Sequence, residues 1–269
     1  MTGERIAVDD PRDPRIADFV GLRDRELARP GPHGGPGVFI AEGDIVAERA
    51  LRAGFSPRAL LVDATRTAPL PPSLPAGTPV YAAAPPVLQR ITGLGVHRGL
   101  LGCFERRSPA GADGVVAAAR RIVVLERVSN PTNLGVILRS AAGLGIDAAL
   151  LDPTCSDPLY RRTSRVAMGE SYAFPWAWIP RLPEGLAPLR AHGFRVVALT
   201  PEVGATPIDR LGPGPDDRVA LLFGAEGPGL SPETLAAADM RAGIPMRGGV
   251  DSLNVGVAAG IACWVLGRR

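Results

Sequence analysis

Short apolar runs alternate along this chain with segments in which apolar residues recur every three or four positions, the patterns of strands and of amphipathic helices. Within residues 1–107 the pattern predicts four strands and two helices. The predicted strands are 38–41, 59–62, 80–82 and 100–104, and the predicted helices are 43–53 and 86–92. The sequence therefore predicts a small N-terminal α/β domain over residues 1–107.

A second and longer alternation follows residues 108–119, which are rich in small residues and are expected to form a linker. It opens with the apolar, β-branched run 121–125, which is typical of a buried parallel strand. Further strands are predicted at 148–151, 195–199 and 219–223, and helices at 134–144, 159–168, 232–238 and 252–266. This alternation predicts a second α/β domain over 120–269 with a mostly parallel, doubly wound sheet.

The composition predicts a hydrophobic core, but no membrane span, disulfide framework or metal site. Hydrophobic residues make up 46% of the chain, yet no apolar run is long enough to cross a bilayer. The N-terminus lacks the apolar core of a signal peptide, so we expect a cytoplasmic protein. Three cysteines (Cys103, Cys155 and Cys263) are scattered without a CxxC or Cys/His cluster, which predicts neither a disulfide framework nor a metal site.

The charges exclude several kinds of chemistry. The net charge is +3, and all thirty basic residues are arginine. A chain without lysine forms no Schiff base with pyridoxal phosphate and has no P-loop lysine. Arginine grips phosphate through two parallel hydrogen bonds, although a genomic preference for arginine codons accounts for most of the count.

The first motif is NPTNLGVILR, residues 130–139, directly after the strand at 121–125. Asn133 is expected to cap the helix that follows. Arg139 is the one charged residue among apolar positions of that helix. An unpaired buried guanidinium is costly, so Arg139 is either functional or a surface arginine paired with a carboxylate, and the pattern alone leaves both open.

Two further motifs lie where strands run into helices. In LLFGAEGPGL, residues 221–230, a strand enters a glycine-rich turn that carries Glu226. Glycines let the backbone approach a ligand closely, and parallel sheets bind ligands at the carboxyl ends of their strands. In IPMRGGVDSLNV, residues 244–255, Ser252 and Asn254 stand at the start of the last helix, where backbone amides are free. Each motif alone is compatible with an ordinary turn.

In their order and spacing, the three motifs resemble the SpoU/TrmH family of SPOUT methyltransferases over residues 121–269. The family's N-x-G-x-x-x-R pattern is present as Asn133, Gly135 and Arg139, and its G-x-E-G pattern as Gly224, Glu226 and Gly227. The I-P-M and S-L-N-V elements are residues 244–246 and 252–255. Ala225 and Asp251 replace the asparagine and glutamate of many members, and neither change removes a key functional group.

This resemblance implies that the protein transfers a methyl group from S-adenosylmethionine to a ribose 2′-hydroxyl of ribosomal or transfer RNA. It implies a trefoil knot in the C-terminal domain and no metal. Five positions match those that hold the cofactor in the family: Thr200, Gly224, Ile244, Met246 and Leu253. A nucleotide-binding oxidoreductase is the less favoured enzyme class, because no GxGxxG loop follows a strand.

The catalytic set that the resemblance implies is Asn133, Arg139, Glu226, Ser252 and Asn254. Arg139 is usually described in the family as a general base. Because a guanidinium holds its proton so firmly, we favour a role in orienting phosphate and stabilising the developing alkoxide. The alternative to an enzyme is an inactive RNA-binding relative, which should have lost at least one of the five residues.

RNA contacts and assembly are also implied. Arg161, Arg162 and Arg165 form a basic cluster that is expected to contact RNA phosphates, with a solvated helix face as the alternative for the first two. The segments 38–44 and 95–99 resemble parts of the family's N-terminal RNA-recognition domain. The last helix is apolar on nearly every side and rich in small residues, and with the resemblance it predicts a homodimer with active sites at the subunit interface. Trp176 and Trp178 could stack on bases, but packing in the core or at an interface is the favoured expectation.

Overall fold

The computed structural model describes residues 5–29, 37–93, 99–212, 214, 216–247 and 249–267. The chain forms two compact units, the first comprising Met1–Ser108 and Leu159–Ala173, and the second Pro109–Pro158 and Phe174–Arg269. The expected domains were 1–107 and 120–269, so the units differ from them chiefly in the segment 159–173. Of the segment 95–99 only Gly99 is described.

The described residues of the first unit contain a five-stranded sheet in the order β1-β4-β3-β5-β2. Its strands are β1 (Arg5–Ala7), β2 (Val38–Glu42), β3 (Pro57–Asp63), β4 (Val80–Ala83) and β5 (Leu100–Glu105). Its helices are η1 (Pro14–Phe19), α1 (Asp24–Leu27), α2 (Asp44–Arg52), α3 (Pro85–Thr92), α6 (Arg161–Val166) and η2 (Glu170–Tyr172). β5 runs antiparallel to β2 and β3, and the other pairs are parallel. Strand β1 was not predicted, because its three residues are all exposed and carry no apolar pattern.

The segment 159–173 is held in the first unit by a buried carboxylate and by aromatic packing. Glu42, at the end of β2, is only 5% exposed and forms ion pairs with Arg161 and, at 2.8 Å, with Arg165. The ring of Tyr172 lies 5.2 Å from that of Phe39. A buried carboxylate needs such partners, because an unpaired charge in the interior is strongly destabilising. These contacts explain why the segment belongs with residues that precede it by more than a hundred positions.

The second unit contains, in its described residues, a seven-stranded sheet in the order β10-β12-β9-β11-β6-β7-β8, with every pair parallel. Its strands are β6 (Arg121–Leu125), β7 (Ala148–Leu151), β8 (Trp176–Trp178), β9 (Arg195–Leu199), β10 (Thr206–Pro207), β11 (Val219–Phe223) and β12 (Met240–Gly243). Its helices are α4 (Ala112–Ala118), α5 (Pro131–Gly143), η3 (Glu184–Leu186), α7 (Ala187–Ala191), η4 (Ile208–Arg210), α8 (Pro232–Ala237) and α9 (Val255–Leu266). The predicted α/β fold with a mostly parallel sheet is confirmed.

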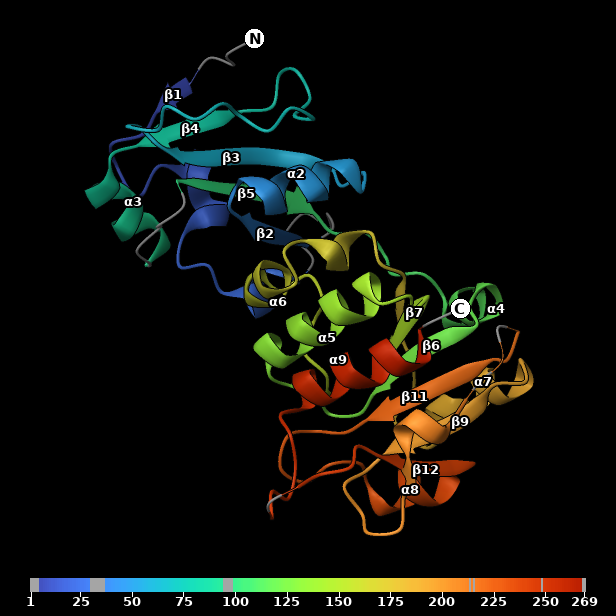
Figure 1. Ribbon diagram of the computed structural model, residues 1–269. Helices are drawn as coiled ribbons and strands as arrows, with labels where there is room; N and C mark the ends of the chain where they lie inside the picture. The colour runs from blue at the N-terminus through green and yellow to red at the C-terminus, as the bar shows by residue number, and fades with distance from the viewer. Residues whose placement is uncertain are drawn as a thin grey trace. The chain divides into compact units, whose positions relative to one another are not determined.

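Both faces of this sheet are covered. In β6, Val123 and Leu125 pack into one apolar cluster with residues of α5 and α9, while Ile122 and Val124 pack into a second cluster with residues of α4 and α7. Figure 1 shows α5 and α9 side by side on the same face. Because successive strand residues point to opposite faces, a run that is apolar throughout requires such a three-layer arrangement.

Two local predictions were wrong. Much of the predicted linker 108–119 is helical, because its Ala-rich stretch favours helix and the side chains of Val115 and Val116 are buried against the sheet. The cap of α5 is Asn130 rather than Asn133: its side chain accepts a hydrogen bond from the amide of Thr132 at 2.9 Å. Pro131 occupies the first helical position, for which its fixed φ is suited, so the helix begins there.

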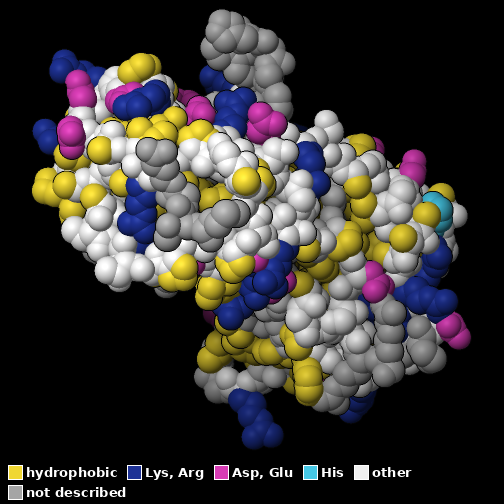
Figure 2. All heavy atoms as spheres, turned by 90° about the horizontal axis from the view of Figure 1, so that it is seen from above, with side chains coloured by type: hydrophobic (Ala, Val, Ile, Leu, Met, Phe, Trp, Pro, Cys, Tyr) yellow, Lys and Arg dark blue, Asp and Glu magenta, His cyan; other side chains and the backbone are white. Residues whose placement is uncertain are grey.

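Charges of both signs are mixed over the face of the molecule that Figure 2 presents, with apolar patches between them. The small net charge of +3 is therefore not gathered into one basic surface on that face. A binding role for individual arginines has to be argued from their own surroundings.

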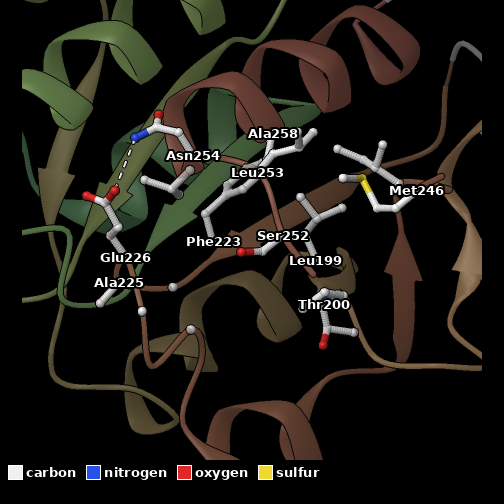
Figure 3. Close-up of a pocket in the computed structure, with 16 residues that line it drawn as sticks. Leu199, Thr200, Phe223, Ala225, Glu226, Met246, Ser252, Leu253, Asn254 and Ala258 are labelled. Atoms are coloured by element: carbon white, nitrogen blue, oxygen red, sulfur yellow. Dashed lines mark hydrogen bonds between the residues drawn. The ribbon is translucent and has the colours of Figure 1, made fainter. Parts of the chain in front are cut away.

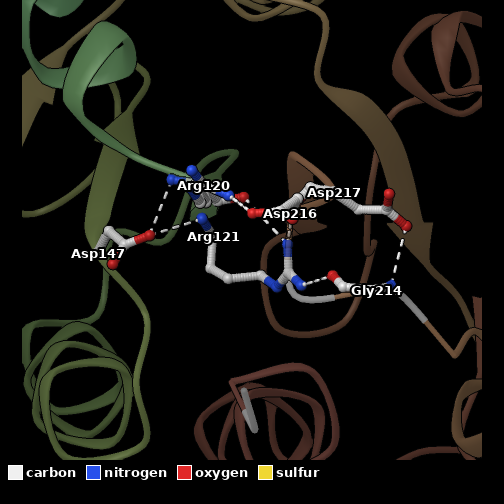
Figure 4. Close-up of polar contacts among 6 residues, drawn as sticks. All are labelled: Arg120, Arg121, Asp147, Gly214, Asp216 and Asp217. Atoms are coloured by element: carbon white, nitrogen blue, oxygen red, sulfur yellow. Dashed lines mark hydrogen bonds and ion pairs between the residues drawn. The ribbon is translucent and has the colours of Figure 1, made fainter.

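The two edges of the seven-stranded sheet differ in construction. At the carboxyl ends of β9 and β11, turns and the segment before α9 surround a cavity (Figure 3). At the opposite edge, the side chain of Arg121 is buried at the start of β6 (Figure 4). Its Nε donates to the carbonyl of Leu266 at 3.0 Å, its Nη2 to the carbonyl of Gly214 at 2.7 Å, and its Nη1 to the carbonyl of Asp217. This one side chain joins the start of β6, the loop before β11 and the last residue of α9.

We predict that Arg121→Leu lowers the free energy of unfolding by about 3 kcal/mol or more, because three hydrogen bonds of a buried guanidinium to backbone carbonyls would be lost. Denaturant unfolding followed by circular dichroism measures the change. Arg120→Ala is the matched control: the neighbouring arginine is exposed and pairs with the exposed Asp216, a contact worth at most about 1 kcal/mol. Equal losses for the two variants would contradict the anchoring role of Arg121.

Candidate functional site

The cavity in the second unit has a volume of about 260 Å³ and opens at the carboxyl edge of the sheet. Three stretches of chain line it: the end of β9, the turn after β11, and the segment that leads into α9. The lining residues are Leu199, Thr200, Pro201, Phe223, Gly224, Ala225, Glu226, Gly227, Gly229, Ile244, Met246, Ser252, Leu253, Asn254, Val255 and Ala258. This is where ligands bind in parallel sheets, because loops from neighbouring strands converge there.

The turn after β11 folds back tightly on the strand that it leaves. A Cβ atom placed on Gly224 would overlap the backbone of Gly229 and Leu230, so only glycine fits at that position. The amide of Gly229 donates to the carbonyl of Ala225 at 3.0 Å and closes the turn. The result is a wall of the cavity made largely of backbone.

Three of the predicted catalytic residues form one hydrogen-bonded network beside the cavity. Asn133 Nδ2 donates to Glu226 Oε2 at 2.9 Å, and Asn254 Nδ2 donates to Asn133 Oδ1 at 3.1 Å and to Glu226 Oε1 at 3.5 Å. Figure 3 shows the contact between Glu226 and Asn254. Asn254 also caps α9, since its Oδ1 accepts from the amide of Gly256 at 2.9 Å. The Nδ2 and the Oδ1 atoms of Asn254 therefore both form hydrogen bonds, which hold the side chain in place.

Arg139 does not join this network. It is exposed on α5, and among the described residues none forms a hydrogen bond or ion pair with it. Six residues separate it from Asn133, which places it about 120° around the helix and about 9 Å along it. Its guanidinium therefore leaves α5 on a different side from Asn133. The alternative was a surface arginine paired with a carboxylate, and no carboxylate among the described residues pairs with Arg139.

The other predicted site residues divide into two groups. Thr200, Gly224, Ile244, Met246 and Leu253, expected at the cofactor, all line the cavity, and so does the exposed Ser252. Of the arginines expected at RNA phosphates, Arg161 and Arg165 pair with Glu42 in the first unit, and Arg162 is exposed. Sequence reasoning missed the apolar wall of Leu199, Phe223, Val255 and Ala258. Leu199 and Phe223 end β9 and β11, and that position was the available signal.

No cluster of three or more potential metal ligands is present among the described residues. Burial raises the pKa of Cys103 and Cys155 well above the ordinary thiol range and that of Cys263 to about 12, so the three thiols stay protonated at neutral pH. Within the same part of the chain, no helix combines the length and the hydropathy needed to span a membrane.

Comparison with known proteins agrees with this geometry. Residues 120–264 match the SpoU rRNA Methylase family. An uncharacterized tRNA/rRNA methyltransferase of Mycobacterium tuberculosis is 42% identical over 255 residues, 94% of this chain and 88% of that protein. The 23S rRNA (guanosine-2′-O-)-methyltransferase RlmB of Acinetobacter baylyi is 31% identical over 201 residues, 72% of this chain and 80% of that protein. The AdoMet-bound rRNA methyltransferase from Sinorhizobium meliloti superimposes with a TM-score of 0.78 and 27% identity, covering 98% of this chain and 97% of that one.

The chain belongs to the SpoU rRNA Methylase family, and its second unit has the SPOUT fold. The protein is an S-adenosylmethionine-dependent RNA 2′-O-methyltransferase. The chemical character of the cavity lining fits that cofactor. The backbone wall at Gly224 offers amide and carbonyl groups, and the apolar side chains suit the faces of an adenine ring.

We predict that Gly224→Ala weakens S-adenosylmethionine binding by about tenfold or more, because the new methyl group must displace the backbone of Gly229 and Leu230. Isothermal titration calorimetry measures the affinity. Gly143→Ala, at the end of α5 with open space around its Cβ position, is the control and should bind as the parent does. Unchanged binding by the Gly224 variant would place the cofactor elsewhere.

Proposed function

We propose that the cavity holds S-adenosylmethionine and that the protein methylates a ribose 2′-hydroxyl of structured ribosomal or transfer RNA beside it. The observation that carries this proposal is the network of Asn133, Glu226 and Asn254 at the cavity, which leaves the exposed Arg139 without a partner among the described residues. A polar network held in place next to an apolar cavity suits the positioning of two reactants.

Each residue of the proposed site has a distinct task. When bound, S-adenosylmethionine supplies a methyl group activated by a positively charged sulfur. The backbone at Gly224, Ile244 and Leu253 holds the cofactor, and Thr200 and Met246 close the cavity around it. Asn133 and Asn254 fix the carboxylate of Glu226, which with the Ser252 hydroxyl orients the ribose. We assign to Arg139 the RNA phosphate and the alkoxide that develops on the 2′-oxygen, since a guanidinium offers planar paired donors.

The working unit that we propose is a homodimer with shared sites. In one chain Arg139 leaves α5 on a different side from Asn133, so the arginine is not aimed at the network of its own subunit. The neighbouring helix α9 exposes Val257 (51%) and Trp264 (53%), seven residues apart and so on one side of the helix. An apolar strip on the helix that packs against α5, together with an arginine that has no partner in the described part of the chain, supports an isologous contact that brings Arg139 of one chain to the cavity of the other.

The first unit is proposed to recognise the RNA, with Arg162 as its exposed candidate for a phosphate contact. Arg161 and Arg165 would serve indirectly, by holding α6 on Glu42. The relatives named for 23S rRNA make ribosomal RNA the first substrate to test, and a cytoplasmic location follows from such a substrate. The alternative is an inactive RNA-binding relative. It is the less favoured, because all five expected catalytic residues are present and three of them are bonded together.

We predict that Arg139→Ala and Arg139→Lys both lose methyl transfer by about a hundredfold or more, because neither offers a planar pair of donors to the transition state. Transfer of labelled methyl groups to total RNA measures activity. Calorimetry should show unchanged S-adenosylmethionine binding, and Arg181→Ala, at another exposed arginine of the same unit, should remain active. Substantial activity in either Arg139 variant would overturn its assignment.

Mixing two inactive variants tests whether sites are shared. One carries Arg139→Ala and the other Leu253→Arg, which fills the cavity. In a heterodimer one site would combine both substitutions and the other would be intact, so activity should recover to about half of the parent value per dimer. Each variant incubated alone should stay inactive. Heterodimers demonstrated by mass spectrometry but lacking activity would mean that each chain builds its own site.

A further inference from the structure

Glu126, the first residue after β6, is a buried carboxylate that lies outside the cavity and its polar network. Glu126 as a whole is only 4% exposed. Oε2 accepts from the backbone amide of Ser231 at 2.9 Å, and Oε1 accepts from the hydroxyl of Thr234 at 3.2 Å. Its backbone amide donates to the carbonyl of Phe223 at 2.9 Å. One residue therefore contacts the segments on both sides of the turn 224–230.

The next residue adds a third contact to the same turn. Arg127 Nη2 donates to the carbonyl of Gly229 at 3.3 Å. Arg127 has a φ of +56°, in the left-handed region that non-glycine residues rarely adopt. That conformation persists only where surrounding contacts hold it, and its cost is of the kind that functional sites carry.

The turn needs this support from outside. It contains Gly224, Gly227 and Gly229, and glycine loses more conformational freedom on ordering than any other residue. Its internal closure is the single hydrogen bond from Gly229 to Ala225, among the described residues. Ser231, where the turn ends, is also the cap of α8, so its position is fixed by both Glu126 and Thr234.

The geometry points to Glu126 as a positioning residue for methyl transfer, which sets the turn 224–230 so that Gly224 forms the cavity wall and Glu226 reaches Asn133. Glu126 lines no part of the cavity, so its effect passes through the turn. This inference rests on the proposed cofactor site. It differs from a general role in stability, because its side-chain bonds go to Ser231, directly after the turn, and to Thr234 in the first turn of α8 that follows.

The experiment compares Glu126→Ala and Glu126→Gln in the full chain. We expect Glu126→Ala to raise the Kd and the KM for S-adenosylmethionine by about tenfold, with a smaller change in the KM for RNA, since the hydrogen bonds that hold Ser231 and Thr234 are lost. Glu126→Gln should restore most of the affinity. Its oxygen can accept from the Ser231 amide, and its NH₂ group can donate to the Thr234 hydroxyl.

Asp147→Ala is the matched control. The Asp147 carboxylate likewise accepts two hydrogen bonds, from the amides of Arg120 and Arg121 at 2.8 Å each, but it does so at the opposite edge of the same sheet (Figure 4). We expect this variant to lose stability without a change in cofactor affinity. All affinities are measured well below the midpoint of thermal unfolding, so that loss of folded protein does not enter.

The outcomes separate the two proposals. A parent chain that fails to bind S-adenosylmethionine would refute the cofactor site itself. A parent that binds, beside a folded Glu126→Ala variant that binds equally well, would overturn the positioning role alone. If Glu126→Ala does not fold, Thr234→Val decides, because it removes the hydroxyl that donates to Glu126 and accepts from the Ser231 hydroxyl, at nearly constant volume. We expect that variant to weaken binding several-fold, and unchanged binding would again overturn the role.

Discussion

Hydrogen bonds from Asn133 and Asn254 to the carboxylate of Glu226 join three segments that are far apart in the sequence. Asn133 precedes Glu226 by 93 residues and Asn254 follows it by 28. The bonds form only if β6 and β11 pair in register and α9 returns beside α5. The seven-stranded sheet can therefore be understood as the frame that brings these three side chains to one edge, where the cavity lies.

The two edges of that sheet divide stability from function. At the amino edge Arg121 and Asp147 form hydrogen bonds to backbone groups with their charged side chains, which fixes the starts of the strands and the end of α9. At the carboxyl edge the chain instead uses glycines, a left-handed Arg127 and exposed polar groups. Such local departures from the most stable choice are tolerated because the rest of the sheet over-determines the structure. They also leave backbone groups open to a ligand.

One chain on its own presents an arginine without a partner among the described residues and an exposed apolar strip on the neighbouring helix. Each feature alone is unremarkable on a protein surface. Their combination next to a cavity is the basis of the proposed homodimer, in which a second copy covers the strip and receives the arginine.

The sequence by itself determined the strands β6, β7, β9 and β11, because strands buried on both faces read as continuous apolar runs. Through its resemblance to a family it also predicted five cofactor-site residues, which the structure brings to one cavity: Thr200, Gly224, Ile244, Met246 and Leu253. Only the tertiary structure decided what depends on distant partners. Arg161 and Arg165 looked like free phosphate ligands, but Glu42 lies 119 residues before Arg161 and pairs with both. The burial of Arg121 against Leu266 was likewise invisible, because a charged side chain is buried only where folding supplies distant acceptors.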